Sequence, residues 1–321
     1  PRSGWQADVM RARVVTNPKS GTDRAPLLLP YVNARLRTVF DEIDITLTTS
    51  LDDAERAGAS ARSQGYDAVY VVGGDGTLNA VVRGMMREAG RTPVPIGVIP
   101  AGTGNDFAKA LGLGEDAKTA VERLLEQRVI DVDVGSLNGR PFVNTSAGGF
   151  VAEVSSIVTE GLKDVTGKLA YLIGGARVLF GSEPFSATLT LAPGAAASGA
   201  GWRGAEPIQM FAVCNARFIG GGYPIAPDAF IDDGLLDVVV VPRMPLLDFV
   251  GVLQRIAAGD HVDDGSVHHF RAPAFDLAFD RRVRVNTDGE VLEAETCRYS
   301  VRPKALPFFC GRGAATLAMR P

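Results

Sequence analysis

Hydrophobic and polar positions follow two different patterns along the chain. In the first part, short runs rich in β-branched residues alternate with stretches whose apolar positions recur at helical spacing. These runs predict strands at 13–17, 43–49, 67–72 and 95–99. Helical spacing predicts helices at 51–64, 77–89 and 115–127, the first beginning at Asp52 or Asp53 as N-cap. Strands that alternate with helices indicate a parallel sheet covered on both faces.

The second pattern begins near Val129, where longer strands with alternating polar and apolar positions take over. Asn138-Gly139 lies between two such runs within 136–143 and is typical of a two-residue hairpin turn. The other predicted elements are strands at 208–215, 235–241, 275–279 and 283–286 and helices at 151–165, 168–180 and 246–258, with a Gly- and Ala-rich hairpin loop at 192–204. This half is therefore predicted to be mostly antiparallel.

Two domains follow from these patterns. The chain of 321 residues is long enough for two apolar cores. We predict an α/β plus mostly-β protein: an N-terminal doubly wound nucleotide domain at 1–132 and a C-terminal antiparallel β-sandwich-like domain with inserted helices at 133–302. The segment 303–321 is expected to return to the first domain.

Composition excludes several classes of protein. The net charge of −4 provides no general attraction to nucleic acid or to anionic lipid. Three cysteines without a CxxC pair and only three histidines argue against a disulfide framework and against a zinc centre built from them. No run of about 18 uncharged apolar residues occurs. We therefore expect a cytoplasmic protein that binds membranes peripherally if at all.

Glycine-rich turns follow three of the predicted parallel strands. They read VVGGDGTLN at 71–79, PAGTGNDF at 100–107 and NPKSG at 17–21. Glycine lets backbone N–H groups approach an anion, and the positive end of a following helix adds to the attraction. A single such turn could equally be a tight connection that needs positive φ. Three of them at the carboxyl edge of one sheet predict a site for nucleotide phosphates.

The motifs GGDGTLN and PAGTGNDFA, preceded by NPKSG, resemble the catalytic domain of diacylglycerol kinases and related bacterial lipid kinases. GGDGT alone is shared with NAD kinases, whereas the pair of motifs is specific. The segments GKLAYLIGGARVL, DDGLLDVVVV and NTDGE follow in the order expected for these lipid kinases. The resemblance therefore covers nearly the whole chain.

The resemblance implies a binding site for ATP and Mg²⁺ at the glycine-rich turns. The implied nucleotide contacts are Asn17, Pro18, Lys19, Ser20, Gly21, Thr48, Gly73, Gly74, Asp75, Gly76, Thr77, Leu78, Asn79 and Thr103. Asp75 would hold Mg²⁺ directly or through water, would cap the helix that follows it, or would do both. Asn105 and Asp106 are interpreted either as the N-cap and first turn of a short helix or as catalytic groups.

The resemblance places the general base in NTDGE, on Asp288 and Glu290, across a cleft from the nucleotide. Their division of roles is open. The alternative is an ordinary hairpin tip with solvated acids. The resemblance also implies a structural Mg²⁺ held by Asp233 and the main-chain carbonyls of Phe230 and Leu235; the alternative there is an ordinary turn before a buried strand. Whether that metal site is occupied is left open.

We therefore expect an ATP-dependent kinase that phosphorylates diacylglycerol to phosphatidic acid, or a related lipid, during transient contact with a membrane surface. The helix at 168–180 either contributes to a lipid pocket or only packs in the core. Two other functions are considered: an NAD kinase-like phosphotransferase, and an inactive lipid- or nucleotide-binding regulator. The acceptor lipid, the membrane-docking surface and the oligomeric state, with a homodimer as one option, are left open.

Overall fold

A computed structural model of the chain describes residues 9–18, 25–87, 93–152, 184–199, 202, 204, 206–263 and 265–316. By internal contacts the chain forms two compact units. The first unit contains Pro1–Asp131 and Leu306–Ala314, and the second contains Val132–Ala305 and Ala315–Pro321. The helix predicted at 168–180, and all but the first residues of the one at 151–165, lie outside the described residues. None of the helices in the described ranges is long and apolar enough to cross a membrane.

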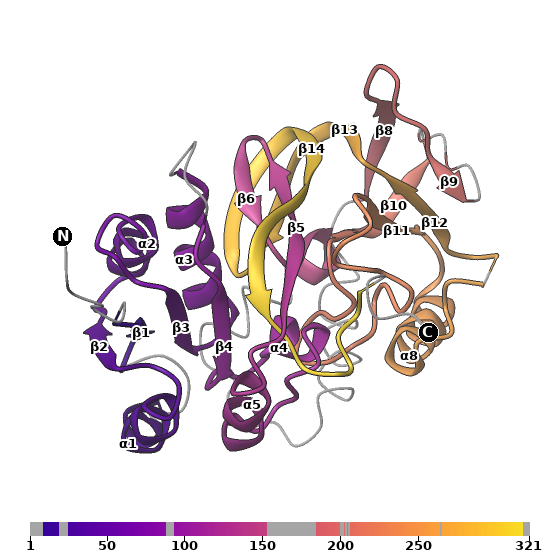
Figure 1. Cartoon of the computed structure of the whole chain (residues 1–321). Helices are drawn as coiled ribbons and strands as arrows, with labels where there is room; N and C mark the ends of the chain where they lie inside the picture. The colour runs from indigo at the N-terminus through magenta and orange to yellow at the C-terminus, as the bar shows by residue number, and fades with distance from the viewer. Residues whose placement is uncertain are drawn as a thin grey trace. The chain divides into compact units, whose positions relative to one another are not determined.

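The first unit is built on parallel strands in the order β2-β1-β3-β4 (Figure 1). The strands are β1 (Arg11–Thr16), β2 (Glu42–Leu47), β3 (Ala68–Gly73) and β4 (Ile96–Pro100). Every residue of β3 and β4 is buried, as expected for central strands covered on both faces. Phe308, near the end of β14 (Glu290–Phe309), pairs in parallel with Ile96. The four predicted strands are confirmed.

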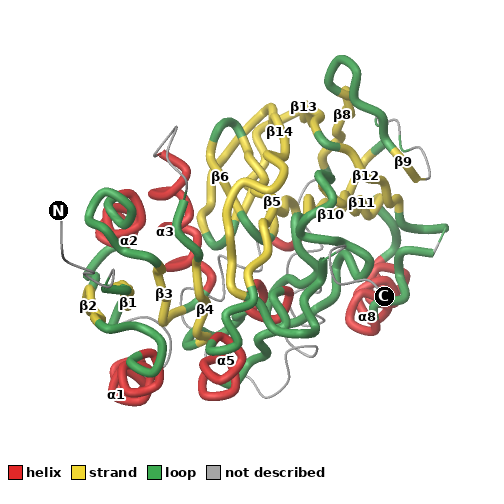
Figure 2. Tube along the Cα trace, in the orientation of Figure 1, coloured by secondary structure: helices red, strands yellow, loops and turns green. Residues whose placement is uncertain are grey.

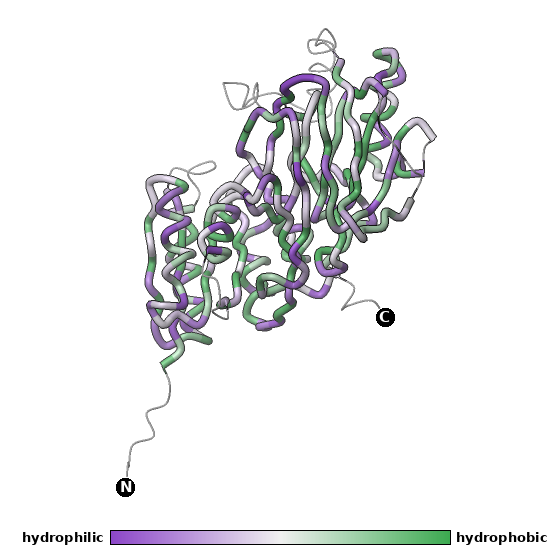
Figure 3. Tube along the Cα trace, turned by 90° about the horizontal axis from the view of Figure 1, so that it is seen from above, coloured by the Kyte–Doolittle hydropathy of each residue, from purple (hydrophilic) through white to green (hydrophobic). Residues whose placement is uncertain are grey.

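Helices cover both faces of these strands. The helices are α1 (Ala25–Leu36), α2 (Leu51–Ala59), α3 (Asp75–Arg87), α4 (Asp106–Ala110) and α5 (Ala117–Leu124). α2 and α3 pack together on one face, and α1 and α5 lie on the other (Figures 1 and 2). In Figure 3 the coils nearest the N-terminus alternate between hydrophilic and hydrophobic colours, which is the pattern of helices with one buried face. The doubly wound arrangement is thereby confirmed.

The sequence pattern did not predict α1, because its leucines are consecutive and Pro30 lies inside it. Contacts to α5 hold it instead. Glu122 accepts hydrogen bonds from the Tyr31 hydroxyl at 2.6 Å and from Arg35 Nε at 2.7 Å. These two donors also hold the pKa of Glu122 low, at about 2. Tertiary contacts thus stabilise a helix that its own residues favour only weakly.

The predicted N-cap of α2 at Asp52 or Asp53 is wrong. Ser50 is the N-cap, and its Oγ accepts a hydrogen bond from the Asp53 N–H at 3.2 Å. In return the Asp53 carboxylate accepts one from the Ser50 N–H at 3.0 Å, which completes a capping box. The reciprocal pair satisfies two backbone donors at once, so the helix begins earlier than an Asp cap would place it.

Two glycines allow α2 and α3 to pack closely. A Cβ atom added to Gly58 would lie 2.2 Å from the Val81 carbonyl oxygen, and one added to Gly84 would lie 1.9 Å from the Glu55 carbonyl oxygen. Both carbonyl oxygens belong to the backbone, so they cannot move away by a change of side-chain rotamer. Any side chain at either position must therefore push the helices apart.

We expect Gly84→Ala to lower the free energy of unfolding by about 3 kcal/mol. This value is at the upper end of the range usual for overpacking, because the added methyl group meets rigid backbone. Chemical denaturation measures this change. Gly251→Ala is the matched control, since no described atom lies within 4 Å of a Cβ at Gly251 in its helix. It should be neutral or raise stability by up to about 1 kcal/mol. Equal stability of wild type and Gly84→Ala would contradict the close packing.

The second unit is dominated by antiparallel strands. The main path runs β14-β13-β7-β10-β11-β12-β9, and β8 pairs with both β10 and β13. The strands not yet bounded are β5 (Val129–Leu137), β6 (Arg140–Phe142), β7 (Thr145–Gly149), β8 (Phe185–Leu191), β9 (Ser198–Gly199), β10 (Pro207–Cys214), β11 (Leu236–Pro242), β12 (His268–Ala272) and β13 (Ala274–Thr287). The hairpin turn at Asn138-Gly139 is confirmed: Leu137 pairs with Arg140, and both turn residues have positive φ, 51° and 82°.

Helix α8 (Leu246–Ala258) has the predicted bounds and ends at Gly259, whose φ is 84°. Its buried residues pack with β10 and β11 in an apolar cluster that includes Phe249 and Val239. One prediction differs in detail: 275–279 and 283–286 form a single strand, β13, with an irregular register between Ala278 and Val283. The charged residues Asp280, Arg281 and Arg282 lie inside this irregular stretch.

Candidate active site

The first glycine-rich turn lies where β3 meets α3. Helix α3 begins at Asp75, directly after the loop residue Gly74. The first N–H groups of a helix have no acceptor within the helix, so this end can bind an anion. Asn79 is 2% exposed, and its Oδ1 has no hydrogen-bond partner among the described residues. A buried polar atom without a partner near such a turn suits a site completed by a ligand.

The second glycine-rich turn touches the first. Gly73 pairs with Pro100, and the Ala101 N–H donates a hydrogen bond to the Gly73 carbonyl at 3.0 Å. A Cβ atom at Gly102 would lie 2.5 Å from the Gly74 Cα. Glycine is therefore required at Gly102, and a Cβ at Gly74 would be tight, 3.2 Å from the Gly102 Cα. The two backbones approach each other without side chains between them, which leaves a polar backbone surface of the kind that cradles phosphate.

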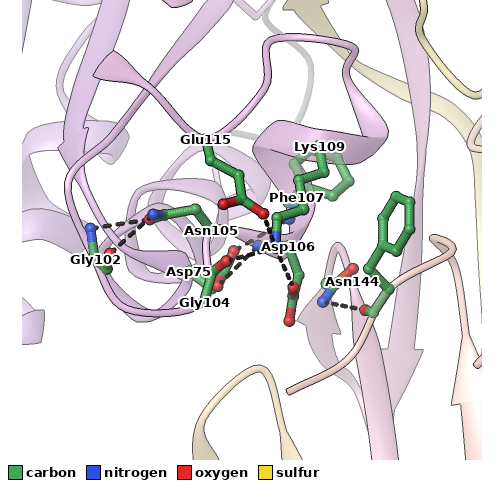
Figure 4. Close-up of polar contacts among 10 residues, drawn as sticks. Asp75, Gly102, Gly104, Asn105, Asp106, Phe107, Lys109, Glu115 and Asn144 are labelled. Atoms are coloured by element: carbon green, nitrogen blue, oxygen red, sulfur yellow. Dashed lines mark hydrogen bonds and ion pairs between the residues drawn. The ribbon is translucent and has the colours of Figure 1, made fainter. Parts of the chain in front are cut away.

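Asn105 fixes the shape of the second turn. Its Oδ1 accepts a hydrogen bond from the Gly102 N–H at 2.9 Å, and its Nδ2 donates one to the Gly102 carbonyl at 2.8 Å (Figure 4). Asn105 stands at the N-cap position of α4 with a φ of 54°, yet its side chain makes no capping bond. The short helix predicted there is confirmed, but the side chain of Asn105 closes the loop instead of capping the helix.

Asp75 caps α4, which belongs to the other turn. Its Oδ2 accepts a hydrogen bond from the Asp106 N–H and its Oδ1 accepts one from the Phe107 N–H, both at 3.2 Å (Figure 4). The alternative that Asp75 caps its own helix is therefore not what these contacts show. Burial, and then the nearby charge of Asp106, raise the pKa of Asp75. The structure thus brings two carboxylates together at the ends of β3 and β4.

These features fit a nucleotide bound with a divalent cation. A bound cation would reduce the repulsion between the two neighbouring carboxylates, of which Asp75 has a raised pKa. Their oxygen atoms are ligands of the kind that Mg²⁺ prefers. The contact between Gly74 and Gly102 holds the two turns side by side, so that their backbone groups can face one ligand. Asp106, left undecided by the sequence, joins Asp75 as a candidate metal-facing group.

Some of the other implied nucleotide contacts are buried and others exposed, and some lie outside the described residues. Thr48 is buried, and its Oγ1 donates a hydrogen bond to the Thr16 carbonyl at 3.2 Å. This bond joins the residue after β2 to the last residue of β1. Thr103 is exposed in the loop between β4 and α4. Asn17 and Pro18 follow β1 directly. Three further residues implied by the resemblance lie outside the described residues: Lys19, Ser20 and Gly21.

In the second unit, Asp288 is buried and held by backbone donors. Its Oδ2 accepts hydrogen bonds from the N–H groups of Val143 at 2.8 Å and Asn144 at 3.2 Å, and its Oδ1 accepts one from Thr145 at 2.9 Å. The residue is 7% exposed and has a φ of 47°. The alternative of a solvated hairpin tip is wrong for Asp288. Three backbone donors thus engage the carboxylate of Asp288, whereas Glu290 is only partly buried.

Further polar groups support the segment that anchors Asp288. Asn215 is buried and its Nδ2 donates to the carbonyls of Val143 at 2.8 Å and Asp133 at 2.9 Å. Asn144 Nδ2 donates to the Phe218 carbonyl at 3.0 Å (Figure 4). Asn215 was not singled out from the sequence, because an Asn at the end of an apolar strand is equally typical of an exposed turn. Its importance becomes visible only through these long-range contacts.

In the predicted metal loop, too, a carboxylate bonds to a backbone N–H. Asp233 Oδ1 accepts a hydrogen bond from the Leu235 N–H at 3.0 Å, so the carboxylate folds back over its own loop. Burial, with smaller contributions from Asp237 and Asp133, raises the pKa of Asp233 to about 6. Among the described residues no group of three or more His, Cys, Asp or Glu could hold a metal. The predicted site uses one carboxylate with the carbonyls of Phe230 and Leu235, and it stays a prediction.

Asp133 was missed by sequence reasoning. It is fully buried, and its carboxylate accepts hydrogen bonds from the N–H groups of Gly234 at 2.6 Å and Lys304 at 2.7 Å. In the pattern of VIDVDVG it occupies a polar position like the exposed Asp131. Alternation alone does not distinguish the buried carboxylate of Asp133 from the exposed one of Asp131. The buried carboxylate instead ties the loop that follows Asp233 to strand β14.

Asp233→Asn should raise the melting temperature in the absence of divalent cations and abolish any additional stabilisation by Mg²⁺ at this loop. A folded-state pKa raised to about 6 means that ionisation costs stability once the pH rises through the ordinary range of an Asp and above 6. Asn removes that cost. Thermal unfolding at pH 5 and pH 8, with and without Mg²⁺, measures both effects. Identical Mg²⁺ stabilisation of the variant and the wild type would remove Asp233 from the metal site.

Comparison with known proteins gives a consistent result. Residues 11–137 match the diacylglycerol kinase catalytic domain, and residues 145–310 match the YegS C-terminal NAD kinase beta sandwich-like domain. A structure from Bacillus anthracis str. Sterne assigned to the diacylglycerol kinases superposes with a TM-score of 0.80 at 24% identity, over 95% of this chain and 98% of that one. This similarity confirms the predicted fold class.

Two curated relatives cover most of both chains. The diacylglycerol kinase of Bacillus subtilis is 31% identical over 281 residues, 87% of this chain and 89% of its own. A protein of Pseudomonas aeruginosa named as a YegS-like lipid kinase is 34% identical over 280 residues, 87% of this chain and 88% of its own. Both domain matches occur in the same order as the motifs. The chain therefore belongs to the family of bacterial diacylglycerol kinases and YegS-like lipid kinases.

Proposed function

We propose that the chain transfers the γ-phosphate of ATP to the hydroxyl of diacylglycerol and forms phosphatidic acid. The observation that carries this proposal is the contact between the two glycine-rich turns at Gly74 and Gly102, beside the carboxylates of Asp75 and Asp106, in a chain of the lipid kinase family. This combination supports the binding of a charged triphosphate. Family membership supports a lipid as the acceptor.

The nucleotide is proposed to bind at the turns that follow β1, β3 and β4. The backbone N–H groups at the start of α3 receive phosphate oxygens, and Asp75 and Asp106 hold Mg²⁺ directly or through water. Bound Mg²⁺ would neutralise charge on the phosphate oxygens during transfer. In the second unit, the loop at Asp233 is proposed to hold a structural Mg²⁺ with the carbonyls of Phe230 and Leu235.

The reaction is an in-line displacement at the γ-phosphorus. The acceptor oxygen forms a bond to that phosphorus while the bond to the bridging oxygen of ADP breaks, and ADP leaves with the electron pair. The proton of the acceptor hydroxyl passes to a carboxylate and then to solvent. We assign this role to Glu290, because the carboxylate of Asp288 is engaged by three backbone donors. Asp288 then fixes the turn that carries the base.

An NAD kinase-like activity is the second candidate, favoured by the match of residues 145–310 to a domain described as NAD kinase beta sandwich-like. The order of the lipid kinase motifs in both units favours the lipid. A lipid acceptor also means that the protein works at a membrane surface without a spanning helix in its described part.

One labelling assay, run as two parallel reactions, separates these candidates. The purified protein is mixed with Mg²⁺, γ-labelled ATP and mixed micelles containing diacylglycerol, sphingosine, ceramide and phosphatidylglycerol, with NAD in a parallel reaction. Label in phosphatidic acid is expected. Label in another lipid would keep the mechanism and change the acceptor. Label only in NADP would establish the second candidate, and nucleotide binding without any labelled product would indicate an inactive regulator.

A further inference from the structure

Lys109 lies at the centre of a cluster of oxygens beside the second glycine-rich turn. Its Nζ donates a hydrogen bond to the Gly104 carbonyl at 3.2 Å and lies 3.5 Å from Asp106 Oδ1. It also forms an ion pair with Glu115 Oε1 at 3.0 Å (Figure 4). The side chain of Lys109 is only 11% exposed, whereas that of Glu115 is 71% exposed. The ammonium group is therefore largely confined to the loop, and Glu115 approaches it from solvent.

The loop between β4 and α4 needs such support. Helix α4 has only five residues, too few to be stable alone. The loop contains Gly102, Gly104 and the left-handed Asn105. Asn105 fastens one end through Gly102, and the bond from Lys109 to Gly104 fastens the other. The side chains of Asn105 and Lys109 thus hold opposite sides of a short turn that is rich in glycine.

Lys109 also balances charge where two carboxylates meet. Asp106 is 4% exposed, and its backbone N–H is bound to the carboxylate of Asp75. Lys109 Nζ lies 3.5 Å from Asp106 Oδ1, so a positive charge stands beside the carboxylate of this buried residue. An ammonium group beside Asp106 therefore reduces the repulsion that the pair would exert on each other and on an incoming triphosphate.

We propose that Lys109 is a positioning residue of the nucleotide site, which holds the 102–106 loop in the form that accepts ATP and offsets the charge of Asp106. The proposal rests on the proposed function, because it takes this loop to be the ATP site. Lys109 acts through Gly104 and Asp106 and is not assigned a contact with substrate. A neutral side chain of similar length should fold but leave the loop loose and more negative.

The test compares Lys109→Met, Lys109→Arg and a control, Lys118→Met. Lys118 is an exposed lysine on α5 whose ammonium lies 5.5 Å from the ring centre of Tyr31 on α1. Titration with a fluorescent ATP analogue should show a dissociation constant raised on the order of tenfold in Lys109→Met, as expected for a lost charged hydrogen bond. Lys109→Arg should retain most of the affinity, and Lys118→Met all of it.

Steady-state kinetics give a second readout. In Lys109→Met the KM for ATP should rise while the KM for the lipid stays constant, a split that general loss of stability would not produce. Hydrogen exchange of the 102–107 amides should become faster in Lys109→Met alone. Unchanged affinity and exchange in that variant, or equal loss in Lys109→Met and Lys109→Arg, would overturn the proposal. Failure of the wild type to bind the analogue would instead overturn the proposed function itself.

Discussion

Asp75→Asn is expected to slow phosphoryl transfer about a thousandfold, which corresponds to about 4 kcal/mol of lost transition-state stabilisation. The amide oxygen can still accept a hydrogen bond from Asp106 or Phe107, so the link between the two turns persists. What is lost is the charge that would hold Mg²⁺. Initial rates at saturating ATP and lipid, over a range of Mg²⁺ concentrations, measure the effect.

Stability should move in the opposite direction. The pKa of Asp75 is higher in the folded state than in the unfolded state. Its ionisation therefore lowers the stability as the pH rises from the ordinary range of an Asp through the folded-state pKa. Without Mg²⁺ at pH 8, Asp75→Asn should melt at or above the wild-type temperature. Asp116→Asn is the matched control, because Asp116 also accepts an N–H at a helix N-terminus, from Thr119 at 2.8 Å, and Asn caps equally well. Normal Mg²⁺ dependence in Asp75→Asn would reduce Asp75 to a structural cap.

Glu290→Gln is expected to lower kcat by about 10³-fold without changing the melting temperature, within the usual range for loss of a general base. Asp288→Asn should lower both activity and stability. Asn tolerates the left-handed backbone of Asp288, so the substitution isolates the carboxylate and its three N–H partners. The loss is expected to be about 2 to 3 kcal/mol in the free energy of unfolding.

Glu293→Gln serves as the control for this pair. Glu293 is exposed on the same strand, β14, and its carboxylate lies 3.9 Å from Arg284 Nε. Rates and unfolding curves of the three variants should separate base from anchor. If Glu290→Gln is active while Asp288→Asn is inactive with native stability, the roles are reversed and Asp288 is the base.

The strands and turns that position the nucleotide site could be predicted from the sequence because their signals are local. A buried apolar run followed by GGDG or AGTG specifies a strand end, a turn that tolerates glycine and a helix start within a dozen residues. The hairpin at Asn138-Gly139 and helix α8 are local in the same sense. The N-cap of α2 was placed wrongly at Asp52 or Asp53, although Ser50 followed three residues later by Asp53 is a local capping-box pattern.

The contacts that give the site its chemistry were not readable. Asp75 caps a helix 31 residues further along the chain, and Asp288 is held by backbone groups more than 140 residues away. Such pairings depend on which strands become neighbours, and single-residue patterns carry no information about this. Helix α1 formed despite an internal proline because Glu122 holds it from α5. In each case tertiary structure decided a role that local propensity left open.

Hydrogen exchange with and without a non-hydrolysable ATP analogue and Mg²⁺ tests the central claim most directly, namely that the turns after β3 and β4 form the nucleotide site. Slower exchange is expected at 73–79 and 100–107, where backbone N–H groups would become bound to phosphate or closed over it. Exchange in helix α8 provides an internal reference and should not change. Binding of the analogue with protection elsewhere, and none in these two turns, would contradict the account.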